Sequence, residues 1–306
     1  MVNILEIKEI KIASFTLITS SVQAILAFIY AVVLLIFASI AGSILASFVP
    51  GFGSFIAFGA AALIIIYPIS AFFIGLMVQF FSALLYNILV PRVGGVKLGL
   101  EGDELVEIPA VSFALILSII GAVWAFIVGL FLAAVIVPMF AFLGSASSTI
   151  PTMTNVTGVP MVTGAAAGVA GIFGALILII GLPIAVFIIG FISNALAAIF
   201  YNFIATRIAK AKLEFEKVSN TLHELKSVPP IPAALSIAVV FTIFGIFAGI
   251  LNLIRFSLQG DVLLGVGALV GEIIWYFILY FVSVALGAFF YNYLVPKIGG
   301  IKLKLE

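Results

Sequence analysis

The sequence predicts an all-α polytopic membrane protein with six transmembrane helices. They form three tandem helix-pair repeats about a pseudo-threefold axis, with a small cytoplasmic β assembly built from inter-repeat strands. Three observations carry this. Hydrophobic residues make up 65% of the chain and charged residues 8%, against roughly 45–50% and 25% in soluble domains. The stretches Ile12 to Pro91 and Ile108 to Thr206 hold no Asp, Glu, Lys, Arg or His. A phrase beginning Tyr-Asn recurs after each long apolar stretch.

The recurring phrase predicts the domain boundaries. It runs from Tyr86 to Glu101, from Tyr201 to Glu216 and from Tyr291 to Glu306, and the three copies align without a gap. An internal repeat of this kind decides the architecture, because each copy should form the same structural unit. We expect three repeats over residues 1–102, 103–218 and 219–306, each a strand, two transmembrane helices and a second strand.

Helix positions follow from the apolar stretches and their breaks. A spanning helix needs only about 20 apolar residues, so each uncharged stretch must cross the membrane more than once. Turn-forming residues divide the three repeats at 50–54, 144–160 and 257–261. The sequence therefore predicts helices over 13–45, 54–92, 110–142, 162–207, 231–256 and 263–296.

Strands are predicted where apolar and polar residues alternate, because period two is typical of a half-buried strand. The alternation occurs after each Tyr-Asn phrase, at 96–101, 211–216 and 301–306, and before the helices at 4–10 and 105–108. A turn at Ser219-Asn220-Thr221 would lead the second of these strands into a sixth, before the third helix pair. Pairing of the N-terminal strand with the C-terminal strand would then close a six-stranded set without a free edge. Ile10, Ile108 and Ile231 are expected to occupy equivalent positions at the openings of the repeats.

The positive charges predict the orientation. Six crossings place twelve of the thirteen Lys and Arg residues on the side of both termini and leave only Arg255 on the other. By the positive-inside rule, the termini of this multi-pass cell-membrane protein are expected in the cytoplasm. The expected partners are the lipid bilayer and proteins at the cytoplasmic face. A net charge of +1 gives no reason to expect nucleic acid.

The polar residues of the repeated phrase are the first candidate site. Asn87, Asn202 and Asn292 follow the three repeated tyrosines. A pseudo-threefold arrangement could gather the amides into a ring that coordinates an ion or lines a pore. Alternatively, each Tyr-Asn pair lies near the cytoplasmic interface, where Tyr is enriched, and the amide bonds across helices or caps a junction.

Two further residues are candidates. Glu272 is the one ionisable residue inside an otherwise uncharged helical stretch, and such carboxylates are functional by default. The helix between Glu272 and Lys297 is longer than the hydrocarbon core is thick. Glu272 could therefore instead lie at the outer interface near Arg255 and Asp261, with a structural role. Asn155 begins an Asn-Val-Thr glycosylation pattern in the outer loop of the second repeat.

The sequence contains no phosphate-binding loop, metal-ligand cluster, nucleophile–base pair or carboxylate pair, so neither enzyme activity nor a cofactor or metal site is expected. We expect a non-catalytic scaffold or accessory subunit of the membrane. The alternative is a small-solute or ion channel or transporter with its path along the pseudo-axis.

The Asn…Gly-Gly phrase resembles the end of a bacterial, actinobacterial-type transmembrane domain of unknown function. Asn87, Gly94 and Gly95 match it, as do Asn292, Gly299 and Gly300. The middle copy keeps Asn202 but has Ala209 and Lys210 in place of the glycines. The resemblance implies three tandem copies of a strand, two helices and an alternating tail, and it implies no chemistry.

Overall fold

The computed structural model describes residues 2–46, 48, 52–149 and 164–306. The chain packs as two compact units. The first contains Met1–Phe113 and Leu196–Glu306, and therefore all the strands together with the helices that lead into them. The second contains Ala114–Ala195.

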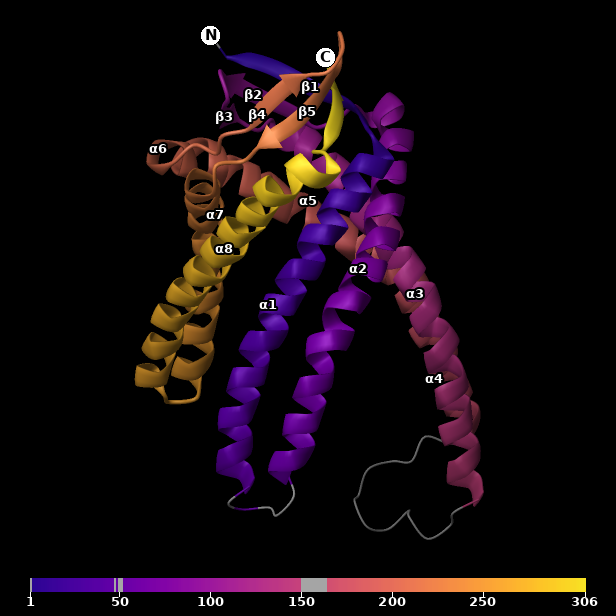
Figure 1. The fold of residues 1–306 in the computed structure, drawn as a ribbon. Coiled ribbons are helices and arrows are strands. Elements are labelled where there is room, and N and C mark those ends of the chain that lie inside the picture. The colour runs from indigo at the N-terminus through magenta and orange to yellow at the C-terminus, as the bar shows by residue number, and fades with distance from the viewer. Residues whose placement is uncertain (1, 47, 49–51, 150–163) are drawn as a thin grey trace. The chain divides into compact units, whose positions relative to one another are not determined.

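Two antiparallel helix pairs form most of the first unit (Figure 1). Helix α1, Ile12–Ala46, packs along α2, Phe52–Val93, and α7, Pro230–Leu258, packs along α8, Val262–Ile298. Glycines allow the second pair to pack closely: a Cβ on Gly249 would lie 2.9 Å from the Leu269 Cα, and one on Gly245 would lie 3.1 Å from the Glu272 carbonyl oxygen. Small residues bring backbones together in lipid in this way.

The second unit contains α4, Gly164–Leu176, with most of α3, Ala110–Thr149, and most of α5, Leu182–Phe200. A π-helical turn, Ile177–Gly181, joins α4 to α5. It lies against α3, where a Cβ on Gly129 would be 2.1 Å from the Leu178 carbonyl oxygen. The fourth span, Gly171–Ile208, is thus one continuous helix, and the π-helical turn within it is a detail that the sequence does not predict.

In the first unit, a second π-helical turn, Tyr201–Ala205, and the short α6, Thr206–Ile208, complete the helices. Among the residues that the structure describes, six helical spans are long and apolar enough to cross a membrane. The six long apolar helices that the sequence predicts are therefore present, which is consistent with a multi-pass membrane protein.

The strands form a six-stranded antiparallel sheet in the order β3-β2-β1-β6-β5-β4. Their bounds are Asn3–Ile10 for β1, Lys97–Glu101 for β2, Glu104–Glu107 for β3, Glu214–Lys217 for β4, Leu222–Ser227 for β5 and Lys302–Leu305 for β6. The N-terminal β1 lies between β2 and the C-terminal β6, which confirms the predicted pairing of the two terminal strands.

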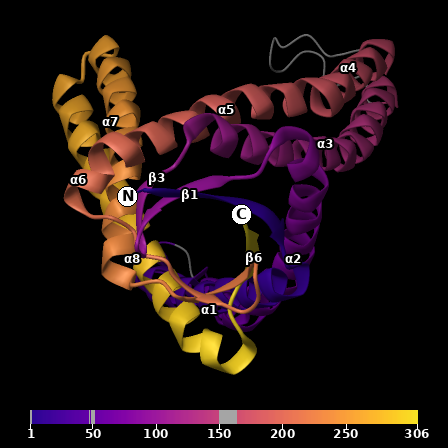
Figure 2. The ribbon, with the colours of Figure 1, turned by 90° about the horizontal axis from the view of Figure 1, so that it is seen from above.

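Hydrogen bonds also join the two ends of this order. The Leu105 N–H donates to the Ala211 carbonyl, and the Leu213 N–H to the Asp103 carbonyl, both at 2.8 Å. Viewed from above, the strands follow one another around a ring (Figure 2). These two bonds, with an isolated bridge between Glu104 and Lys212, link β3 to the segment that leads into β4.

The strand ring is filled with apolar side chains. Leu100, Leu105, Leu225, Leu303 and Leu305 are all buried. Leu213 and Phe215 pack against both hydrophobic clusters that lie between the strands and the helix ends. The alternation in the sequence therefore corresponds to an apolar inner face and a charged outer face of the strands.

Candidate functional site at the helix–sheet junctions

Three buried tyrosines connect helix ends to the strand ring. Each hydroxyl donates to the carbonyl of one strand residue and accepts the N–H of the residue ten positions after the tyrosine. The carbonyls belong to Ile7 for Tyr86, Leu105 for Tyr201 and Leu225 for Tyr291, at 2.7, 2.7 and 2.6 Å. The N–H groups belong to Val96, Ala211 and Ile301, at 2.9, 3.2 and 3.0 Å. One hydroxyl thus bridges two backbone segments at each junction.

The three asparagines hold the passage from strand to helix. Each Oδ1 accepts the N–H, and each Nδ2 donates to the carbonyl, of one backbone residue. The pairs are Asn87 with Ile10, Asn202 with Ile108 and Asn292 with Val228, at 2.8–2.9 Å. Both ends of each amide are engaged with backbone, which is the geometry of a capped junction.

These bonds correct one expected equivalence. Val228, and not Ile231, occupies the position of Ile10 and Ile108, because it is the residue that Asn292 holds. The sequence is ambiguous here, because both Val228-Pro229 and Ile231-Pro232 match the apolar-Pro pattern of Ile108-Pro109.

A glutamate at each junction was missed by the sequence analysis. Glu6 and Glu224 each accept a backbone N–H through Oε1, from Gly95 at 2.8 Å and from Gly300 at 2.7 Å. Lys8 and Lys226 contact the same two carboxylates at 2.9 and 3.3 Å. A signal was present in the sequence: Glu6, Glu104 and Glu224 each stand six residues before a helix begins.

The environment lowers the pKa of both carboxyl groups. Burial acts to raise the pKa of Glu6 and Glu224, but the glycine N–H and the neighbouring lysine favour the charged form more strongly. The net pKa of each therefore lies below its ordinary value, and both groups are ionised at neutral pH.

The glycine pairs are required by backbone geometry. Gly94 and Gly299 have φ of 82° and 83°, which L side chains rarely adopt. A Cβ on Gly95 or Gly300 would lie 2.2 Å from the carbonyl oxygen of Ile7 or Leu225, so these positions admit no side chain.

The middle junction is built differently, as Ala209 and Lys210 suggest. Ala209 is extended, with φ of −153°. The Glu104 carboxylate contacts the ammonium groups of Lys210 and Lys212 at 3.1 and 3.3 Å. These ion pairs hold the pKa of Glu104 below its ordinary value, and the contact with Lys210 has the largest effect. The same three side chains line a surface pocket of about 360 Å³ with Thr206.

Glu272 lies far along α8 from the sheet junction. Its Oε1 accepts a hydrogen bond from the Asn252 amide of α7 at 3.1 Å, and its side chain is half-buried. Glu272 thus bonds to an amide of the facing helix. The sequence instead suggests a position near Arg255 and Asp261. Asn155, the glycosylation candidate, lies outside the described residues.

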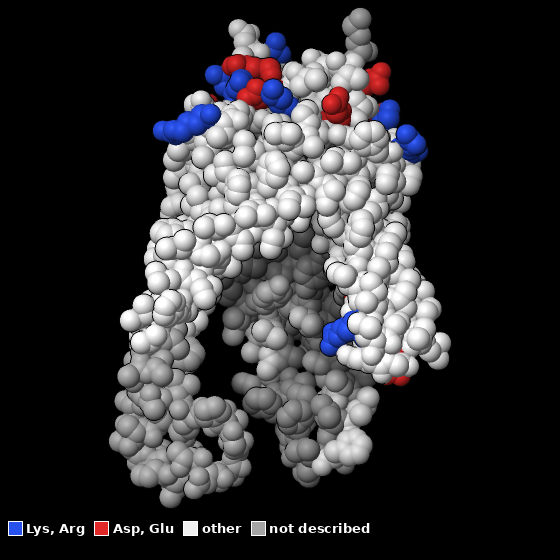
Figure 3. All heavy atoms as spheres, turned by 180° about the vertical axis from the view of Figure 1, so that it is seen from behind, with Lys and Arg blue, Asp and Glu red and all other residues white. Residues whose placement is uncertain are grey.

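Charged side chains gather at the strand end of the molecule (Figure 3). Within the described ranges, no three His, Cys, Asp or Glu residues are grouped so that they could hold a metal ion. The chain matches no protein-family model, no curated protein and no solved structure.

Proposed function

We propose that this chain is a non-catalytic scaffold or accessory subunit of the cell membrane, built from three tandem helix-pair repeats about a pseudo-threefold axis. The threefold recurrence of the tyrosine and asparagine bonds supports the repeat boundaries at 1–102, 103–218 and 219–306. In this proposal the helices anchor the strand ring, and the ring presents its charged outer face to protein partners.

The scaffold proposal rests on one observation: the polar side chains at the helix–sheet junctions are already bonded to the protein's own backbone. The tyrosine hydroxyls and asparagine amides bond to backbone, and apolar side chains fill the strand ring. A conducting path needs polar groups that face water or substrate. The candidate asparagines instead bond to backbone within the protein. The charged outer face of the strand ring is therefore the surface that we expect to function.

We further propose that both termini and the strand ring are cytoplasmic. Twelve of the thirteen Lys and Arg residues belong to the sheet side of the chain, which supports this orientation. The chain has no cysteine, so single cysteines report their side directly. Asp103→Cys and Ser219→Cys should label from the cytoplasm, and Gln259→Cys, in the α7–α8 turn, from outside. Labelling of all three from one side would refute the topology.

Affinity capture from native membranes tests the scaffold proposal. A tagged chain should retain stoichiometric partners, and Lys302→Glu with Lys304→Glu on the outer face of β6 should release them. Arg255→Glu is the matched control, because it reverses a charge in the last turn of α7 and not on a strand. Capture that is unaffected by the β6 changes, or absent from the unaltered chain, would contradict the proposal.

The Glu272–Asn252 pair favours a channel or transporter as the second candidate. It places a carboxylate inside a span of α8, where ionisable groups mark ion and substrate pathways. Flux of ions or small solutes into liposomes that contain the purified chain would support this candidate if Glu272→Gln abolished it. Liposomes that stay tight would support the scaffold.

A further inference from the structure

A mainly apolar pocket with a few polar groups in its lining lies among the helices of the first unit. It has a volume of about 460 Å³ and is lined by α1, α2 and α8 together with residues at the ends of β5 and β6. Two of the three glutamines of the chain, Gln23 and Gln79, line it, with Thr19 beside them. Leu26, Val284 and Tyr291 contribute apolar walls.

The two glutamines lie at membrane depth. Gln23 is eleven residues from the start of α1, and Gln79 is fourteen residues from the end of α2. At 1.5 Å per residue, these positions are about 16 and 21 Å from the helix ends. Both depths fall inside a hydrocarbon core of about 30 Å. Amides are unfavourable there unless they bond to a partner.

Neither glutamine amide has a hydrogen-bond partner among the residues that the structure describes. Two buried hydroxyls on the same face of α1, Thr16 and Ser20, also lack a partner within that part of the chain. Ser20 has no exposed surface and Thr16 is 7% exposed. Thr16, Ser20 and Gln23 follow at helical spacing, so a stripe of unsatisfied polar groups leads to the pocket.

The lining fixes the charge of a ligand. None of the described residues that line the pocket is Asp, Glu, Lys, Arg or His, and an amide can both donate and accept hydrogen bonds. An uncharged carbonyl or hydroxyl group therefore complements the two glutamines, whereas an ion would lack a counter-charge.

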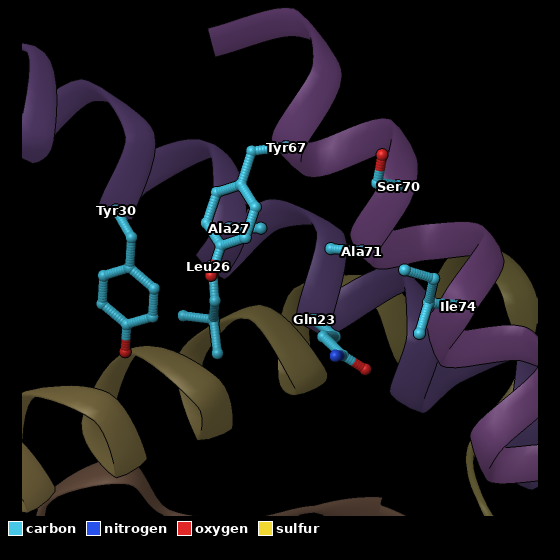
Figure 4. A pocket seen from close by; sticks show the side chains of 8 residues that line it. All are labelled: Gln23, Leu26, Ala27, Tyr30, Tyr67, Ser70, Ala71 and Ile74. Carbon is cyan, nitrogen blue, oxygen red and sulfur yellow. The ribbon is translucent and has the colours of Figure 1, made fainter. Parts of the chain in front are cut away.

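A second pocket adjoins the first. It has a volume of about 360 Å³, shares Gln23 and Leu26 with it, and lies between α1 and α2. In Figure 4, Gln23, Leu26 and Tyr30 project from α1 and Tyr67 from the facing α2. This space offers apolar walls for the body of a ligand whose head reaches the glutamines.

We propose that this pocket binds a lipid-like molecule with an uncharged carbonyl- or hydroxyl-bearing head on an apolar body. The head bonds to Gln23 and Gln79 and satisfies amides that the protein leaves unpaired. Two sources carry this chemistry, a glyceride and a prenylated quinone. The site does not depend on whether the chain is a scaffold or a transporter.

Binding to the full chain in detergent micelles tests the proposal, with dioctanoylglycerol and decylubiquinone as the probes. One probe should bind saturably, and which one binds identifies the source. Gln23→Leu and Gln79→Leu should each weaken its binding about tenfold or more, the effect of one lost hydrogen bond in an apolar site. Gln259→Leu, which changes the third glutamine in the α7–α8 turn, should bind as the unaltered chain does.

Leu26→Trp separates pocket occupancy from polarity, because it fills the space and keeps both amides. It should also reduce binding. The proposal is overturned if neither probe binds saturably, if the glutamine variants bind as tightly as the unaltered chain, or if Gln259→Leu loses binding to the same extent.

Discussion

The hydroxyl of Tyr291 lies 2.6 Å from the carbonyl oxygen of Leu225, 66 residues earlier in the chain. The same hydroxyl accepts the Ile301 N–H at 3.0 Å. Through these two bonds the end of α8 is joined to β5 and to the segment that leads into β6. The relationship recurs at Tyr86 and Tyr201. Each of the three helix ends that carry these tyrosines is thus joined to the strand ring by a buried side chain as well as by the chain connection.

Tyr291→Phe should lower the free energy of unfolding by about 1–3 kcal/mol, because it leaves a buried carbonyl and a partly buried N–H without their partner. Chemical denaturation in detergent micelles measures the change. Tyr293→Phe is the control, since Tyr293 is 54% exposed and its ring lies under the Lys297 ammonium. Equal losses in the two variants would show that the bridging hydroxyl has no special role.

Gly300→Ala should destabilise the chain by about 1–3 kcal/mol or prevent folding, because the added Cβ would overlap the Leu225 carbonyl oxygen. Gly271→Ala, in α8, is the matched control. Apart from the adjoining backbone of α8 itself, no atom of the described residues lies within 4 Å of its added Cβ, and alanine favours a helix. The thermal midpoint should fall for the first variant and hold or rise for the second. The opposite order would contradict the close approach at Gly300.

Stability should decline in acid because of Glu224. Its folded pKa is lowered below the ordinary value, 4.5, so the carboxylate stabilises the fold above that value. The contribution is lost as the pH falls through the folded pKa. Glu224→Gln should therefore be less stable at neutral pH, and its thermal midpoint should fall less between neutral pH and acid.

Glu104→Gln is the comparison for that measurement. Glu104 contacts two partly exposed lysines, and solvent screens such surface pairs so that they contribute little to stability. Its pH profile should stay close to that of the unaltered chain. If Glu104→Gln flattened the acid limb as much as Glu224→Gln did, the bond to the Gly300 N–H would not be the cause.

The Asn252–Glu272 bond should couple α7 to α8. Glu272→Leu should cost about 0.6–1.7 kcal/mol, the range for side-chain hydrogen bonds between helices in membranes. Glu272→Gln, which keeps an acceptor for the Asn252 amide, should cost less. A double-mutant cycle with Asn252→Leu measures the coupling, and additive losses would mean that the two side chains do not interact.

The strands illustrate how far the sequence reaches. Alternation at 301–306 predicts β6, and the need to cover edges predicts that β6 lies beside β1. The middle copy is less regular: β4 begins at Glu214, while Lys212 forms only an isolated bridge with Glu104. In this copy Ala209 and Lys210 replace the glycine pair, and Ala209 has an extended backbone. The alternation of apolar and polar residues does not predict this difference.

The candidate residues illustrate the limit. Recurrence identifies Asn87, Asn202 and Asn292, but only the folded chain shows that each amide bonds to one backbone residue. Glu6 and Glu224 carried a sequence signal that is plain once their glycine partners are known. Gln23 and Gln79 carried none, since they lie in different helices and meet only where those helices line one pocket.

The sequence alone determined the apolar helices that are long enough to cross a membrane and the alternating strands, because apolar length and residue period are properties of neighbouring residues. The tertiary structure decided what the polar groups do. A hydroxyl at Tyr291, an amide at Asn292 and a carboxylate at Glu224 find their partners across long separations in the chain. A hydrogen bond depends on the distance between two atoms in space, and only the packing of helices against the strand ring sets that distance.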